Sequence, residues 1–223
     1  MIQAEEHLQE FVTGLQSVLE SKLLSIVLYG SAAQGESYAP QSDLNVLVIL
    51  KEFSLSDLSN LKKVIHKGRK QARIVPIFWT EEELKNSLDV FPVEFLEMAG
   101  HHKVLYGADL LSGLSVDTKN LRHQIEFELR SKLLRLRAEW LDFEASPKSR
   151  ANILSQAGTS LTVLFSRIQG IAGAKLDNSL SDPLRRCLLL KRGEIKLNRE
   201  ELSQLFRNVH DFVSKIIQVV NKI

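Results

Sequence analysis

Two apolar runs of strand length, at residues 23–29 and 45–50, constrain the fold of this chain more than any other feature of its sequence. The first run ends at a glycine, and its length and composition predict a buried strand. After Asn45 the second run contains no polar residue, as expected for a strand that is covered on both faces. The two runs therefore predict the central strands of a sheet.

Helices are predicted before and after these strands. Apolar positions in residues 2–21 recur at the spacing of one helix face. Ser54 or Ser56 can cap a second helix that runs to about residue 70, because either side chain can accept a hydrogen bond from a free N–H group of the first turn. Residues 80–83, Thr-Glu-Glu-Glu, have the pattern of a capping box and predict a short third helix.

A third strand is predicted at residues 73–79. Pro76 places this strand at an edge or a bulge, because proline cannot donate to a ladder. Residues 95–106 fit either a helix or a last strand, closed by Gly107. Helices and strands in this order predict an α/β fold, or an α+β fold with a mixed sheet.

The second half of the chain is predicted to be an all-α bundle. Apolar residues recur with helical period along two long segments, a shorter helix opens at Asp182-Pro183, and a last helix follows. Four antiparallel helices with short connections form a bundle. We therefore expect two domains, at residues 1–118 and 119–223.

The net charge of +2 conceals an asymmetry between these two parts. Residues 1–118 carry 10 Lys and Arg against 16 Asp and Glu, a balance of −6, whereas residues 119–223 carry the remaining 19 and 11, a balance of +8. The basic part suits phosphate-rich or acidic partners, or it simply has an arginine-rich solvated face. The basic stretch from Lys62 to Arg73 favours a solvated helix face over nucleic-acid binding.

Composition excludes several classes of protein. The single cysteine, Cys187, excludes an intramolecular disulfide framework and a cysteine-based zinc site. No segment approaches the ~18 unbroken apolar residues of a membrane span, and residues 1–16 do not resemble a signal peptide. For His101-His102, which have no distant partner at ligand spacing, surface histidines are favoured over a metal site. We expect a soluble, cytoplasmic protein with no membrane partner.

The segment between the two central strands carries the chemistry. A strand that ends at Gly30-Ser31 lets the backbone approach a phosphate closely, and the serine hydroxyl adds another hydrogen-bonding group. Asp43 and Asn45 flank Leu44, so strand alternation puts their side chains on one face. Two carboxylates at that spacing can share divalent cations, and nucleotidyl transfer uses such a pair.

Gly30-Ser31, Gly35, Ser42, Asp43 and the apolar strands around them resemble the polymerase-β-like nucleotidyltransferase superfamily. The likeness is greatest to its minimal and aminoglycoside-type members, which carry Gly-Ser, a spacer and then Asp-x-Asp. The sequences FPVEFLEM, VLYGADLL and LRHQIEFELRSKLLRLR also resemble those of uncharacterised bacterial nucleotidyltransferase-domain proteins with a helical C-terminal half. The resemblance implies a nucleoside triphosphate as ligand and Mg²⁺ as cofactor.

The sequence departs from this family pattern at the metal ligands. By the pattern, Asp43 is the first metal ligand and the candidate catalytic acid, but the second position is Asn45, whose amide oxygen is neutral. The third carboxylate would lie on the strand at residues 73–79, which contains no acidic residue. Mg²⁺ favours anionic oxygens, so its binding is disfavoured. Substitute acids would have to come from Glu94 or residues 81–83, and the latter are more simply explained as a helix start.

These observations predict a degenerate nucleotidyltransferase-like protein that binds a nucleotide or a protein partner with little or no transfer. One alternative is an active enzyme that moves a nucleotidyl group to a small-molecule or protein hydroxyl, and another is an antitoxin-like or scaffold protein. Arg130 and Arg137 lie with Arg122 on one side of a helix, where an ion-pair ladder with Glu126 is the simpler explanation. The candidate nucleotide-binding residues are Gly30, Ser31, Asn45, Arg130 and Arg137.

Overall fold

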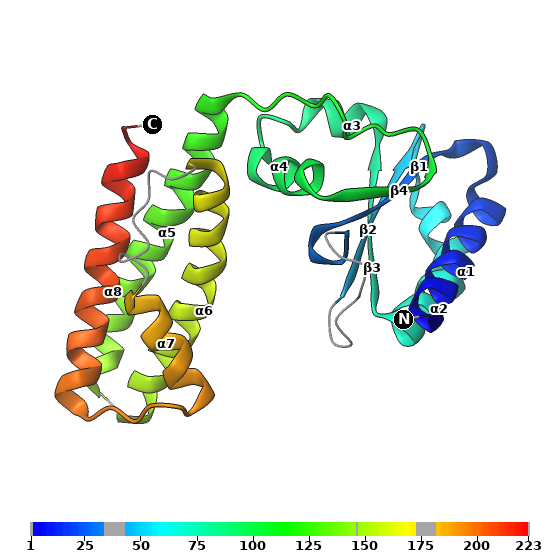
Figure 1. Cartoon of the computed structure of the whole chain (residues 1–223). Helices are drawn as coiled ribbons and strands as arrows, with labels where there is room; N and C mark the ends of the chain where they lie inside the picture. The colour runs from blue at the N-terminus through cyan, green and yellow to red at the C-terminus, as the bar shows by residue number, and fades with distance from the viewer. Residues whose placement is uncertain (1, 34–42, 146, 173–181, 223) are drawn as a thin grey trace. The chain divides into compact units, whose positions relative to one another are not determined.

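The computed structural model describes residues 2–33, 43–145, 147–172 and 182–222. The chain forms two compact units, Met1–Asn120 and Leu121–Ile223, which are described separately (Figure 1). That they are independent domains divided after residue 118, as the charge pattern suggests, stays a prediction. No helix in the described part of the chain is long and apolar enough to cross a membrane.

The first unit is built on four strands, β1 (Leu23–Tyr29), β2 (Leu44–Leu50), β3 (Ile74–Thr80) and β4 (His102–Gly107). They form one sheet in the order β3-β2-β1-β4. β1 is antiparallel to β2 and to β4, whereas β2 and β3 are parallel. The mixed sheet confirms the expected fold class, and Pro76 lies in an edge strand as predicted.

Four α-helices belong to this unit: α1 (Ile2–Leu19), α2 (Leu55–Ala72), α3 (Glu81–Asn86) and α4 (Pro92–Gly100). Capping boxes start two of them, at Ser54 with Asp57 for α2 and at Thr80 with Glu83 for α3. The stretch that fitted either a helix or a strand contains both, because α4 ends at Gly100 and β4 begins two residues later.

The sheet is covered on both faces. α1 and α2 pack on one face, and α3, α4 and residues 110–116 contribute to the core on the other. β2 supplies both cores, which confirms its prediction as a strand covered on both sides. Its fully buried side chains are Val46, Val48 and Leu50 on the α1–α2 face and Leu47 and Ile49 on the opposite face.

The second unit is helical, as predicted. Its helices are α5 (Thr118–Ala145), α6 (Pro147–Ala172), α7 (Asp182–Arg192) and α8 (Arg199–Val220). Trp140 and Phe143 of α5 pack against Phe206 of α8, with ring centroids 4.9 and 4.8 Å from that of Phe206. α6 and α7 approach closely at Gly158, where an added Cβ would collide with Cys187.

Candidate functional site

Gly30 opens a short 3₁₀ turn, η2 (Gly30–Ala33), immediately after β1. Its φ is +78°, a conformation that glycine adopts without strain. The Gly30 N–H donates to the carbonyl of His101 at 3.1 Å, which ties the turn to the start of β4. A Cβ at position 30 would lie 3.5 Å from Nδ2 of Asn45. The structure therefore brings Gly30 and Asn45 together, with the exposed Ser31 next to them.

Asn45 belongs to a row of four residues that crosses the sheet at this end. Asn45 pairs with Tyr29 of β1 and with Val75 of β3, and Tyr29 pairs with His102 of β4. Side chains paired in this way share a face of the sheet. Burial, with a smaller contribution from the charge of Glu97, raises the pKa of Tyr29 to about 12. A neutral phenol therefore lies beside Asn45 at physiological pH.

Asp43 precedes β2 and forms an ion pair with Arg73. The Nε of Arg73 donates to Oδ1 of Asp43 at 2.8 Å, and the two side chains are 57% and 51% exposed. The sequence predicted Arg73 as the first residue of the third strand, which was wrong. α2 instead ends at Ala72, Arg73 caps it in the left-handed region at φ 52°, and β3 begins at Ile74. The Arg73 carbonyl accepts a hydrogen bond from the Leu44 N–H at 3.1 Å, which holds the residue against the start of β2.

The described residues at this end of the sheet do not fit a magnesium ion. Asp43 is paired with Arg73, and Asn45 offers a neutral amide. Val75, the β3 residue paired with Asn45, is apolar, and β3 contains no acidic residue. Across residues 2–33, 43–145, 147–172 and 182–222, no three His, Cys, Asp or Glu side chains gather as a metal site. One carboxylate that already has a cationic partner is a poor ligand set for Mg²⁺.

Two of the acids considered as substitute ligands have local roles. Glu83 accepts hydrogen bonds from the N–H and the hydroxyl of Thr80, at 2.8 and 3.1 Å. Glu81 accepts from Nζ of Lys85 at 2.6 Å. These contacts are those of a helix start, which was the simpler explanation. Gly35 and Ser42, which carry part of the family resemblance, lie outside the described residues.

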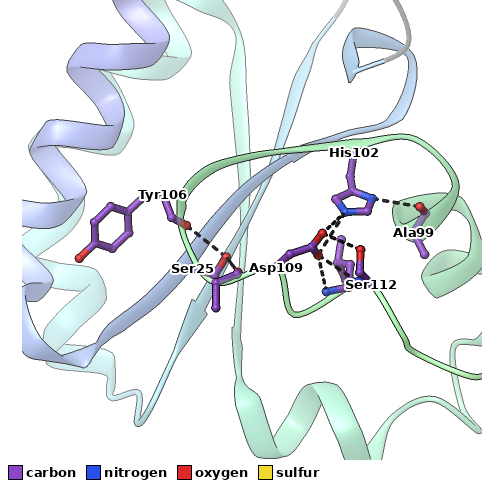
Figure 2. A network of polar contacts seen from close by, with 8 residues as sticks. Ser25, Ala99, His102, Tyr106, Asp109 and Ser112 are labelled. Atoms are coloured by element: carbon purple, nitrogen blue, oxygen red, sulfur yellow. Dashed lines mark hydrogen bonds and ion pairs between the residues drawn. The ribbon is translucent and has the colours of Figure 1, made fainter.

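A network around His102 and Asp109 was not predicted from the sequence (Figure 2). Nδ1 of His102 lies 2.9 Å from the carbonyl oxygen of Ala99, and Nε2 lies 3.1 Å from the Asp109 carboxylate. Each ring nitrogen therefore lies against an oxygen acceptor. With its side chain 14% exposed, His102 is not the surface histidine that was expected.

Asp109 fixes the segment that follows β4. It accepts hydrogen bonds from the hydroxyl and N–H of Ser112, at 2.6 and 2.9 Å, and from the Leu111 N–H at 3.1 Å. The Ser112 hydroxyl first, then its N–H and further hydrogen bonds from His102 and Leu111, hold the pKa of Asp109 well below its usual range. An aspartate that bonds to the backbone two and three residues later is a turn signal that the sequence did contain. Its pairing with His102 depends on tertiary structure and has no local signal.

Arg130 and Arg137 belong to the second unit, on α5. Glu126 forms ion pairs with Arg122 at 3.2 Å and with Arg130 at 2.7 Å, so the ion-pair ladder is present. Nε of Arg137 lies 3.5 Å from Nε2 of His210. A nucleotide-binding role for Arg130 and Arg137 stays a prediction.

Comparisons with known proteins agree with the geometry of the first unit. Residues 8–99 match the family model of the nucleotidyltransferase domain. The crystal structure of spectinomycin adenyltransferase from Enterococcus faecialis, solved with ATP and spectinomycin, resembles this chain with a TM-score of 0.53 at 14% identity, over 94% of this chain and 99% of that one. No curated protein matches significantly. Residues 8–99 of the first unit therefore match a nucleotidyltransferase domain, and the chain shares the fold of a solved adenyltransferase, as the resemblance to the polymerase-β-like nucleotidyltransferase superfamily predicted.

Proposed function

We propose that the nucleotidyltransferase domain binds a nucleoside triphosphate at the Gly30-Ser31 turn and transfers its nucleotidyl group slowly or not at all. The observation that carries this proposal is the occupancy of the three metal-ligand positions. Asp43 is paired with Arg73, and the two neighbouring positions hold Asn45 and Val75. Mg²⁺ normally neutralises the triphosphate and activates the attacking oxygen, and its loss removes most of the stabilisation of the transition state.

The turn itself retains what phosphate binding needs. Gly30 has no side chain to hold a ligand away from the backbone, and Ser31 is exposed beside it. The Asn45 amide, adjacent to Gly30, can donate to a phosphate oxygen although it is a poor metal ligand. The spectinomycin adenyltransferase with the related fold was solved with ATP, which supports a nucleoside triphosphate as the class of ligand.

Two measurements test this proposal. Calorimetric titration of the full chain with ATP and GTP, each with and without Mg²⁺, should detect binding. Incubation with labelled triphosphates and candidate small-molecule and protein acceptors should show no transfer above a buffer blank. Robust transfer that Asp43→Ala abolishes would support the alternative of an active enzyme. No binding of either nucleotide would refute the proposed ligand class.

A protein partner is the second candidate, and a feature of α5 favours it. Phe127, Leu134 and Leu141 are 67%, 64% and 77% exposed. They are seven residues apart, a spacing that places them on one face of the helix. Such an apolar stripe suits a scaffold or antitoxin-like role. Cross-linking during purification from the native cell, lost on substitution of all three by Gln, would support this role over nucleotide binding.

A further inference from the structure

We propose that the Arg73 guanidinium takes the place of the metal ion at this site, so that a triphosphate binds without a divalent cation. Asp43 then acts against binding, because it competes with the phosphate for the same guanidinium. This inference rests on the proposed function, in which a nucleoside triphosphate binds at the Gly30-Ser31 turn. It reverses the role that Asp43 has in the family pattern, from a contributor to nucleotide binding to an inhibitor of it.

The backbone of Arg73 is fixed at the edge of the sheet where the turn lies. Its N–H donates to carbonyls of the last turn of α2, including that of Arg69 at 3.1 Å, and its own carbonyl accepts from Leu44 at 3.1 Å. Residue pairing continues from Ile74 opposite Leu44 to Val75 opposite Asn45. Asn45 in turn lies beside Gly30. Arg73, Asp43 and the Gly30 turn are therefore at the same end of three adjacent strands.

The guanidinium has donors to spare for a phosphate. Its contact with Asp43 uses Nε and one carboxylate oxygen. Arginine carries five N–H donors in a planar fork, so four remain on the two terminal nitrogens, and the described residues supply no further hydrogen bond to them. Such a fork matches the oxygens of a phosphate.

The ion pair is also easy to exchange. Both partners are more than half exposed, so solvent screens their attraction and stabilises either charge when the pair opens. A triphosphate carries several negative charges where Asp43 carries one, and it would displace the carboxylate from Arg73. Removing the Asp43 charge should therefore strengthen phosphate binding, whereas removal of a metal ligand would weaken it. Substitution of Asp43 should therefore raise the affinity for ATP if Arg73 binds the phosphate, and lower it if Asp43 is a metal ligand.

The test is calorimetric titration of the full chain with ATP in excess EDTA. Wild type should bind, Asp43→Asn should bind about threefold tighter or more, and Arg73→Gln should bind about tenfold weaker, the range expected for losing a charge-assisted hydrogen bond. Arg69→Gln removes the same charge from an exposed neighbour in the last turn of α2 and should bind like wild type. Arg73→Lys keeps the charge but not the fork and should fall between wild type and Arg73→Gln. Circular dichroism should give the same helix content for all variants.

Different failures point to different errors. If wild type binds ATP only with Mg²⁺, or if Asp43→Asn weakens binding, Arg73 does not replace the metal ion, while the proposed nucleotide binding stands. Equal affinities of Arg73→Gln and wild type in EDTA lead to the same conclusion. If wild type binds no triphosphate with or without Mg²⁺, the proposed function and this inference both fail.

Discussion

Adding carboxylates at residues 45 and 75 should make the stability of the protein depend on magnesium, which we do not expect of the wild-type protein. The double substitution Asn45→Asp and Val75→Asp places two acids at paired positions of β2 and β3. Adjacent strands are ~4.8 Å apart. Two charges at that distance repel by ~0.9 kcal/mol in water and by ~3.5 kcal/mol at an effective dielectric constant of about 20. The variant should therefore be destabilised by about 1–3 kcal/mol in EDTA, since Val75 is 38% exposed and Asn45 is partly buried.

Mg²⁺ should reverse this destabilisation. A ligand present at one hundred times its dissociation constant stabilises a folded protein by ~2.7 kcal/mol. For a chain of this size that corresponds to a rise in Tm of roughly 5–10 °C, since each kcal/mol shifts Tm by about 2–4 °C. Thermal unfolding in Mg²⁺ and in EDTA measures the effect, and Val75→Asn is the matched control because it adds a polar group without charge. An equal rise in the Tm of wild type would show that the native site already binds Mg²⁺, and the reasoning would be refuted.

Three further outcomes are expected. Gly30→Val should weaken ATP binding and leave the helical circular dichroism of the second unit unchanged, because a side chain at φ +78° is strained and would stand between the ligand and the backbone; unchanged affinity would place the ligand elsewhere. Gly158→Ala should lower the free energy of unfolding by about 1–3 kcal/mol, because the added methyl group would collide with Cys187. The control, Gly100→Ala in α4, meets no atom and should be neutral or slightly stabilising. Equal denaturant midpoints for the two variants would contradict this expectation. Burial raises the pKa of Tyr29 in the folded protein to about 12, so the contribution of its neutral phenol to stability is complete below pH ~10 and is lost as the pH rises towards 12. Tyr29→Phe should remove the rise in phenolate absorbance near pH 12. A rise that persists in this variant belongs to another tyrosine.

Elements with strong local signals were predicted within one or two residues. The strand at residues 23–29 has the predicted bounds, and β2 differs by one residue, because each run is apolar and ends at a distinct polar or glycine residue. Thr80 and Glu83 form the predicted capping box, whose contacts are made within four residues. Such features depend on neighbours in the sequence and need no tertiary information.

The features that were missed depend on how the backbone turns and which side chains meet in the folded chain, and the residue pattern does not show either. Arg73 was assigned to a strand, because nothing in the sequence shows that α2 ends in the left-handed region or that Asp43, 30 residues earlier, pairs with its side chain. His102 was read as exposed, although it contacts Ala99 and Asp109 on either side of it in a folded network. The sequence showed that position 45 and the third strand lack the acids of the family pattern. It did not show that Asp43, the remaining acid, pairs with Arg73.

The division of β2 between two cores has a consequence for how the protein opens. Its alternate side chains are fully buried on opposite faces of the sheet. A slip of one residue would exchange the contents of both cores and turn Asn45 to the other face. The β2 amides should therefore exchange with deuterated solvent only through global unfolding, while the exposed Asp43 and Arg73 side chains rearrange freely in the folded protein. β2 thus holds Asn45 at a fixed position in the site, while the side chains of Asp43 and Arg73 can adjust to a ligand.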